Sequence, residues 1–105
     1  MKLTQFRDVL NSVSSDINVY HEEALKEENQ FIVWNENKIK SLYADSECAE
    51  FKYSVTVIYI TKTEYDETPL KIMQKFDENF IAYGDCKIEH MTGTDTWIYS
   101  WEAEV

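Results

Sequence analysis

The last nine residues constrain the fold more than any other stretch of this chain. In a β-strand successive side chains point to opposite faces. An extended conformation would therefore place Trp97, Tyr99, Trp101, Ala103 and Val105 on one face, and Ile98, Ser100, Glu102 and Glu104 on the other. Chain ends are usually polar and frayed. The alternation therefore predicts a terminal strand docked in a sheet, with its aromatic face covered by another part of the protein.

The composition predicts one globular domain spanning residues 1–105. Hydrophobic residues make up 44% of the chain and aromatic residues 14%, so a core that buries roughly 60–70% of the unfolded surface is expected. With 2 glycines and 1 proline there is little room for linkers. The apolar runs fall short of the ~18–20 residues of a membrane span, and the first residues lack a secretory signal. Cytosolic residence with reduced Cys48 and Cys86 is therefore expected.

Two helices are predicted from apolar residues at helical spacing. The first spans residues 2–13, with Leu3, Phe6, Leu10 and Val13 on one face. The second begins at Thr68-Pro69, because threonine caps free N–H groups and proline suits the first helical position. Its predicted apolar stripe consists of Leu70, Met73, Phe76 and Phe80.

Strands are predicted at 17–20, 31–34, 38–44, 49–61, 81–89 and 96–105. A turn at Asn35–Asn37 would join the second and third strands. A polar break is predicted at 45–47, and an acidic loop or a weak helical turn at 21–30. The longest strand has Phe51, Tyr53, Val55, Val57 and Tyr59 on one face. Ile58 and Ile60 make its far end apolar on both faces, so a helix or a neighbouring subunit should cover that end.

This order of elements is helix, four strands, helix and two strands. It predicts an α+β fold of two layers, in which two helices pack on a mostly antiparallel sheet of five to six strands. The side chains expected to be core or subunit contacts are Trp34, Tyr43, Ile58, Ile60, Trp97 and Trp101.

The residues that could perform chemistry form no recognisable constellation. His21 and His90 have acidic neighbours but lie outside any His-Glu-x-x-His or Cys-x-x-Cys pattern, and both are interpreted as solvated surface histidines. Cys48 and Cys86 are interpreted as inert thiols. We therefore predict no catalytic, cofactor-binding or metal-binding residue, and a protein that is not an enzyme.

The charge disfavours nucleic-acid binding. Twenty acidic against ten basic residues give a formal charge of −10, and Arg7 is the single arginine. Affinity for nucleic acids comes mainly from lysine and arginine side chains that neutralise phosphates. The acidity is interpreted first as a source of solubility. The sharper alternatives are a surface that stays close to DNA without adhering to it, or one that mimics DNA.

Five segments together resemble a known family. They are FIVW at 31–34, YAD at 43–45, YSVTVIYITK at 53–62, FDEN at 76–79 and the closing WIYSWEAEV at 97–105. In order and spacing the chain resembles the small tail-terminator proteins, also called tail-completion or minor capsid proteins, from the head–tail gene modules of long-tailed phages and prophages of Gram-positive bacteria. One departure is Phe80, which stands where the family pattern often has a glycine.

The resemblance implies a structural protein that caps the tail tube and joins the tail to the head. It implies a ring, expected to be a hexamer, whose subunits can be monomeric before assembly, with no cofactor and with tail-tube and head-connector proteins as partners. The expected locations are the host cytoplasm during assembly and then the virion. Six copies at −10 each would place a charge of about −60 around a channel for DNA, which would repel phosphates. No membrane partner and no specific nucleic-acid binding are expected.

An alternative function remains open on the sequence alone. A small acidic phage-encoded protein could instead be an inhibitor or DNA mimic that binds a host nuclease or another DNA-binding protein. That function would require acidic side chains on one face at phosphate-like spacing. A small enzyme is the third class, and it is disfavoured by the missing catalytic pattern.

Overall fold

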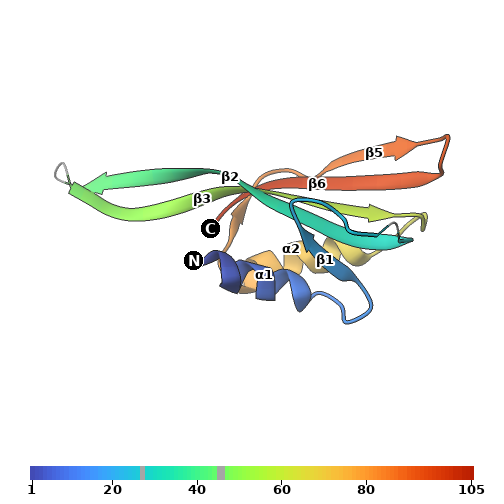
Figure 1. Cartoon of the computed structure of the whole chain (residues 1–105), viewed down its shortest axis with the longest axis horizontal. Coiled ribbons are helices and arrows are strands. Elements are labelled where there is room, and N and C mark those ends of the chain that lie inside the picture. Colours follow the sequence, from blue (N-terminus) through green and yellow to red (C-terminus); the bar gives the residue numbers. More distant parts are fainter. Residues whose placement is uncertain (27, 45–46) are drawn as a thin grey trace.

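The computed structural model describes residues 1–26, 28–44 and 47–105, and within them the predicted α+β class is confirmed. Helices α1 (Leu3–Asn11) and α2 (Thr68–Glu78) lie on the same face of a six-stranded sheet (Figure 1). The opposite face of the sheet has no helix on it (Figure 1), and we call it the open face. Neither helix is long and apolar enough to cross a membrane.

The sheet is built around the C-terminal strand. Its strands are β1 (Asn18–His21), β2 (Gln30–Ala44), β3 (Glu47–Thr61), β4 (Ala82–Tyr83), β5 (Lys87–Met91) and β6 (Thr96–Glu104). The order is β1-β2-β3-β6, and β4 and β5 both pair with the far edge of β6. The β1–β2 pair is parallel, whereas the other pairs are antiparallel. The predicted docking of the chain end is therefore confirmed.

The core lies between the two helices and the middle of the sheet. At its centre, the ring of Phe76 stacks on Phe6 with centroids 6.1 Å apart, and meets Trp101 edge-on at 6.3 Å. Phe6, Phe76 and Trp101 are all at most 1% exposed. Each buried aromatic side chain contributes about 1.5–3 kcal/mol through the hydrophobic effect, so this aromatic contact is a main reason why the helices stay on the sheet.

The face of α2 that packs on the core differs from the predicted stripe. Pro69, Ile72 and Phe76 are buried, whereas Leu70 is 63% exposed and Phe80 is 97% exposed. Phe76 belongs to two series of apolar residues at helical spacing. One series contains Ile72, and the other contains Leu70 and Met73. The helix ends at Glu78, so Phe80 lies outside it. The series with Leu70 and Met73 therefore has one residue fewer on the helix than predicted.

The predicted turn at Asn35–Asn37 is wrong, because β2 runs through it as a single strand. The residue pairing shifts between Glu36 and Lys38, which makes Asn37 an extra residue, or β-bulge. Its side-chain amide donates to Thr56 Oγ1 on β3 at 2.8 Å. Asn37 is therefore satisfied by a hydrogen bond across the sheet, while Asn35 donates to Asn37 within β2.

The predicted strand at 81–89 is also wrong as a single element. It is divided into β4 and β5, which pair with different parts of β6. Between them, the N–H of Gly84 donates to the carbonyl oxygen of Glu102 at 2.9 Å. Of the predicted polar break at 45–47, residues 45–46 lie outside the described residues, and Glu47 begins β3.

Helix α2 ends in a left-handed residue that is not glycine. Phe80 has a φ of 56°. The N–H of Phe80 donates to Asp77 O at 3.2 Å and that of Ile81 to Phe76 O at 2.9 Å, which is the Schellman pattern of a helix end. The position for which the family pattern suggested glycine thus has the conformation that glycine adopts most easily.

We predict that Phe80→Gly stabilises the protein by about 1 kcal/mol. A residue with a Cβ in the left-handed region costs about 1–2 kcal/mol, and glycine removes this cost. Part of the gain is offset, because glycine loses more conformational entropy on folding than phenylalanine does. Urea denaturation would measure the change. Phe80→Ala is the matched control, since it removes the exposed ring but keeps Cβ. An equal gain in both variants would show that the ring, and not the backbone, is the source.

We predict that Trp101→Ala destabilises the fold by about 3–5 kcal/mol, the range typical of large-to-small core substitutions. Trp101→Phe should cost clearly less, because the indole N–H is buried with no hydrogen-bond partner among the described residues. Urea denaturation of both variants tests this order. Equal losses would mean that the indole nitrogen makes a stabilising contact.

Candidate subunit interface

The sheet extends beyond the helices as a two-stranded arm, which we define as residues 38–44 of β2 and 47–53 of β3. It forms one end of the molecule, whose extents are 52 × 25 × 25 Å (Figure 1). Strand β1 pairs with β2 only up to Trp34, and the last backbone bonds from the C-terminus reach Tyr53. Among the residues that the structure describes, no third strand pairs with the arm past these points.

One face of the arm is apolar and exposed. The bulge at Asn37 shifts the alternation of β2, so that Ile39 pairs with Tyr53 and Ser41 with Phe51. Tyr43 falls on the same face two residues further along β2. Ile39, Phe51 and Tyr43 are 60%, 62% and 68% exposed. This face continues the side of the sheet that the helices cover elsewhere, but the arm lies beyond their reach.

The other face of the arm is charged. Lys40 lies opposite Lys52, and Lys38 lies opposite Ser54. Lys40 forms an ion pair with the carboxylate of Glu104 at the end of β6, and this contact lowers the pKa of Glu104. The arm is therefore amphipathic, with one apolar side and one charged side, on which three lysines lie beside Glu50.

A second apolar surface lies on the open face, at the opposite end of the sheet from the arm. Val33, Ile58 and Ile60 line a groove there together with the buried Phe31. The loop after β1 forms the rim, where Leu25 is 79% exposed beside Glu22 and Glu23. We call this the open-face groove. The partial burial of its strand residues comes from neighbouring side chains and the loop, since both helices are on the other face (Figure 1).

The six side chains predicted as core or subunit contacts are found in four environments. Trp34 and Trp101 lie in the core, at 4% and 1% exposed. Ile58 and Ile60 line the open-face groove. Tyr43 lies on the arm, and Trp97 is half-buried beneath His90. The sequence prediction did not include Ile39 or Phe51 among these contacts, because the polar triplet Asn35–Asn37 was interpreted as a turn and not as a bulge within one strand.

Both histidines are exposed and stack on tryptophans. His21 lies 4.3 Å from the ring of Trp34 and 2.5 Å from the Glu36 carboxylate. His90 lies 4.2 Å from the ring of Trp97 and 3.2 Å from Asp95. The hydrogen bond from His21 lowers the pKa of Glu36. Each histidine ring covers one face of a tryptophan, and these contacts need no chemical function.

His21, Glu22 and Glu36 are a group of three potential metal ligands, with ligating atoms within 4.8 Å of one another. A structural zinc site normally has four ligands, and Glu36 is already paired with His21. The thiol of Cys86 is half-buried, and burial raises its pKa, which makes it a poor nucleophile. The side chain of Cys48 lies outside the described residues.

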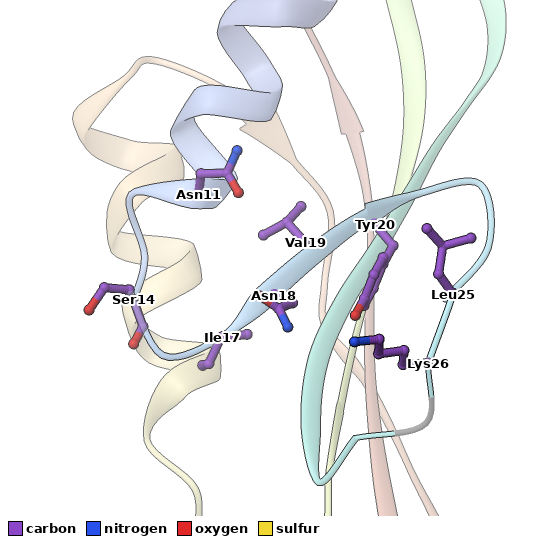
Figure 2. Close-up of a pocket in the computed structure, with 9 residues that line it drawn as sticks. Asn11, Ser14, Ile17, Asn18, Val19, Tyr20, Leu25 and Lys26 are labelled. Atoms are coloured by element: carbon purple, nitrogen blue, oxygen red, sulfur yellow. The ribbon is translucent and has the colours of Figure 1, made fainter.

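A shallow pocket lies between the end of α1, strand β1 and the loop that follows it. In Figure 2, Leu25 and Lys26 approach from the loop, while Ile17, Asn18 and Val19 line the other side. Tyr20 OH and Asn18 Nδ2 both donate to the carboxylate of Glu28. That contact raises the pKa of Tyr20 and lowers that of Glu28. The polar groups here hold the loop against β1, so the pocket is explained by folding alone.

A half-buried acid, Asp66, links the start of α2 to the sheet. The Asp66 carboxylate accepts hydrogen bonds from Tyr59 OH at 2.5 Å, Thr61 Oγ1 at 2.9 Å and Gln30 Nε2 at 3.0 Å. It also accepts the N–H of Thr68 at 2.9 Å. The predicted cap at Thr68 is therefore wrong: Thr68 is the first residue of the helix, and Asp66 supplies the acceptor.

These contacts shift two pKa values in opposite directions. Burial alone would raise the pKa of Asp66, but hydrogen bonds from Tyr59, Thr68 and Thr61 outweigh it and lower the pKa to about 2. Burial, followed by the hydrogen bond to Asp66, raises the pKa of Tyr59 to about 12. The ionised carboxylate and the neutral phenol are thus the forms that fit the folded state.

Comparisons with known proteins leave the family unassigned. No protein-family model matches the sequence, and no curated protein matches it. Among solved structures, the fold is similar to the sheath/tube terminator of an extracellular contractile injection system, PVC, in its extended state. The TM-score is 0.43 and the identity 7%, over 100% of this chain and 56% of the other. This chain thus spans little more than half of that terminator, and a likeness this distant assigns no function.

We predict that acid weakens the fold through Asp66. Its pKa lies below that of an unfolded aspartate, so its stabilisation is present above about pH 4 and is lost as the pH falls towards about 2. At neutral pH, Asp66→Asn should cost about 1–3 kcal/mol. The difference from wild type in urea denaturation should shrink across that pH window. Asp85→Asn, at an exposed loop position, is the control; a constant difference for Asp66→Asn would contradict the prediction.

Proposed function

We propose that this protein is a tail-terminator subunit of a long-tailed phage or prophage. In this proposal it assembles into a ring, expected to be a hexamer, that caps the tail tube and joins it to the head. Its partners are other copies of itself, the tail-tube protein and the head-connector protein. It works without a cofactor and catalyses no reaction. It acts in the host cytoplasm during assembly and becomes part of the virion.

The observation on which the proposal depends is the arm. A two-stranded ribbon is only marginally stable by itself in water, and exposed apolar surfaces and strand edges normally mark interaction sites. Here Ile39, Tyr43 and Phe51 form such a surface, in a chain of 105 residues that has a complete core elsewhere. An arm of this kind suits a subunit whose partner supplies the missing cover.

The resemblance in sequence supports the same proposal. The segments 31–34, 53–62 and 97–105 that carry it fall in β2, β3 and β6, which are neighbours in the sheet. The segment 76–79 falls at the end of α2, where Phe76 packs on Trp101. The shared residues are thus the framework of the fold, which is what a family of assembly proteins without an active site would have in common.

We predict that deleting the gene leaves separate heads and tails of irregular length in induced lysates, as seen by electron microscopy, because uncapped tubes can neither stop growing nor join heads. A plasmid copy should restore normal particles. Normal particles after deletion would refute the function and favour the inhibitor alternative. The triple variant His21→Ala, His90→Ala, Cys86→Ser should restore particles as well as wild type does, because the function requires no catalytic group.

A further inference from the structure

We propose that the apolar face of the arm of one copy packs into the open-face groove of the next copy. The inference rests on the proposed function, because it names the contact by which subunits of the ring would join. It is a heterologous contact, in which each copy presents its arm to one neighbour and its groove to the other.

The apolar face of the arm has no cover among the residues that the structure describes. Its exposed apolar residues Ile39, Tyr43 and Phe51 lie beyond the helices that cover the same face of the sheet elsewhere (Figure 1). Tyr53, at the base of the arm, is half-buried. An apolar partner surface would remove these side chains from water and would also support a ribbon of only two strands.

The open-face groove has the properties of that cover. Its strand residues Val33, Ile58 and Ile60 are apolar and half-buried. It lies on the opposite face of the sheet from the apolar side of the arm, and at the opposite end of β2 and β3. One chain therefore cannot fill its own groove with its own arm. Two copies in similar orientations can overlap so that the arm of one lies on the groove of the other. Contacts of this type repeat, and they close into a ring when the rotation between copies permits.

The charge of the arm allows it to approach a second copy. The segment 38–53 contains three lysines and three acidic residues, so its formal charge is zero, and the rest of the chain carries the whole −10. Two acidic bodies repel each other, while the neutral arm can approach. The rim of the groove carries Glu22, Glu23 and Lys26. Lys38 and Lys52 start on the far face of the arm, so their long side chains could meet the two carboxylates only at the edges of the contact.

The size of the contact predicts its strength. Aromatic side chains bury roughly 150–250 Å² each, so covering the exposed parts of Tyr43, Phe51 and Ile39 would bury roughly 300–400 Å². A stable interface buries about 800 Å² per partner. A single arm contact is therefore weak, whereas a closed ring gives each subunit two such contacts. This accounts for a subunit that stays monomeric when dilute and assembles on a template.

Three matched substitutions test the contact by sedimentation velocity at up to about 1 mM protein, where interactions with millimolar dissociation constants are visible. Phe51→Asp alters the arm, Leu25→Asp alters the groove rim, and Leu70→Asp on α2 is the control. All three replace exposed apolar side chains by the same charge, and urea denaturation verifies that each folds. We expect a rise of about tenfold or more in the dissociation constant for the first two, and none for the control.

Mixing the variants tests the pairing itself. Leu25→Asp keeps an intact arm and Phe51→Asp keeps an intact groove, so the two together should form one-to-one pairs that grow no further, although each alone is monomeric. Several outcomes would overturn the contact: no association of wild type, association of Leu25→Asp equal to wild type (as arm-to-arm pairing would give), no pairs in the mixture, or an equal loss in Leu70→Asp. The gene deletion judges the proposed function separately, since a terminator could form its ring through another surface.

Discussion

The fold depends on the burial of the apolar face of β6 beneath α2. Trp101 and Phe76 meet edge-on, and Phe6 from α1 stacks on the other side of Phe76. These three side chains join both helices to the central strand in one contact. Asp66 adds a polar link from the start of α2 to Tyr59 and Thr61 on β3. With the middle of the sheet stabilised in this way, β2 and β3 can continue outwards without a third layer.

That continuation gives the protein an exposed apolar surface. The bulge at Asn37 changes which side chains of β2 face the helix side, and so places Ile39 and Tyr43 beside Phe51. Without the extra residue, the lysines of β2 would lie on that face instead. A single polar residue therefore determines that the arm has one apolar side and one charged side.

Several parts of the structure follow from local pattern alone. The alternation in 97–105, the apolar spacing of α1 and the long strand ending at Thr61 each predicted an element of the correct type, and together they predicted the α+β class. The candidate interface was predictable only in part. Ile58, Ile60 and Tyr43 stood out as apolar residues without an obvious cover, but Ile39 did not, because Asn35–Asn37 has the composition of a turn and its hydrogen-bond partners on β3 and β6 are distant in sequence.

The sequence by itself determined the class of fold, the docked terminal strand and the acidity, because these depend on periodicity and composition within short windows. Only the tertiary structure decided three things. They are which face of α2 packs on the core, that β2 continues through Asn35–Asn37 without a turn, and which apolar side chains remain exposed. Those outcomes depend on contacts between residues far apart in the chain, such as Phe76 with Trp101 and Asn37 with Thr56. Local propensity is weaker than such contacts, and so the tertiary arrangement prevailed.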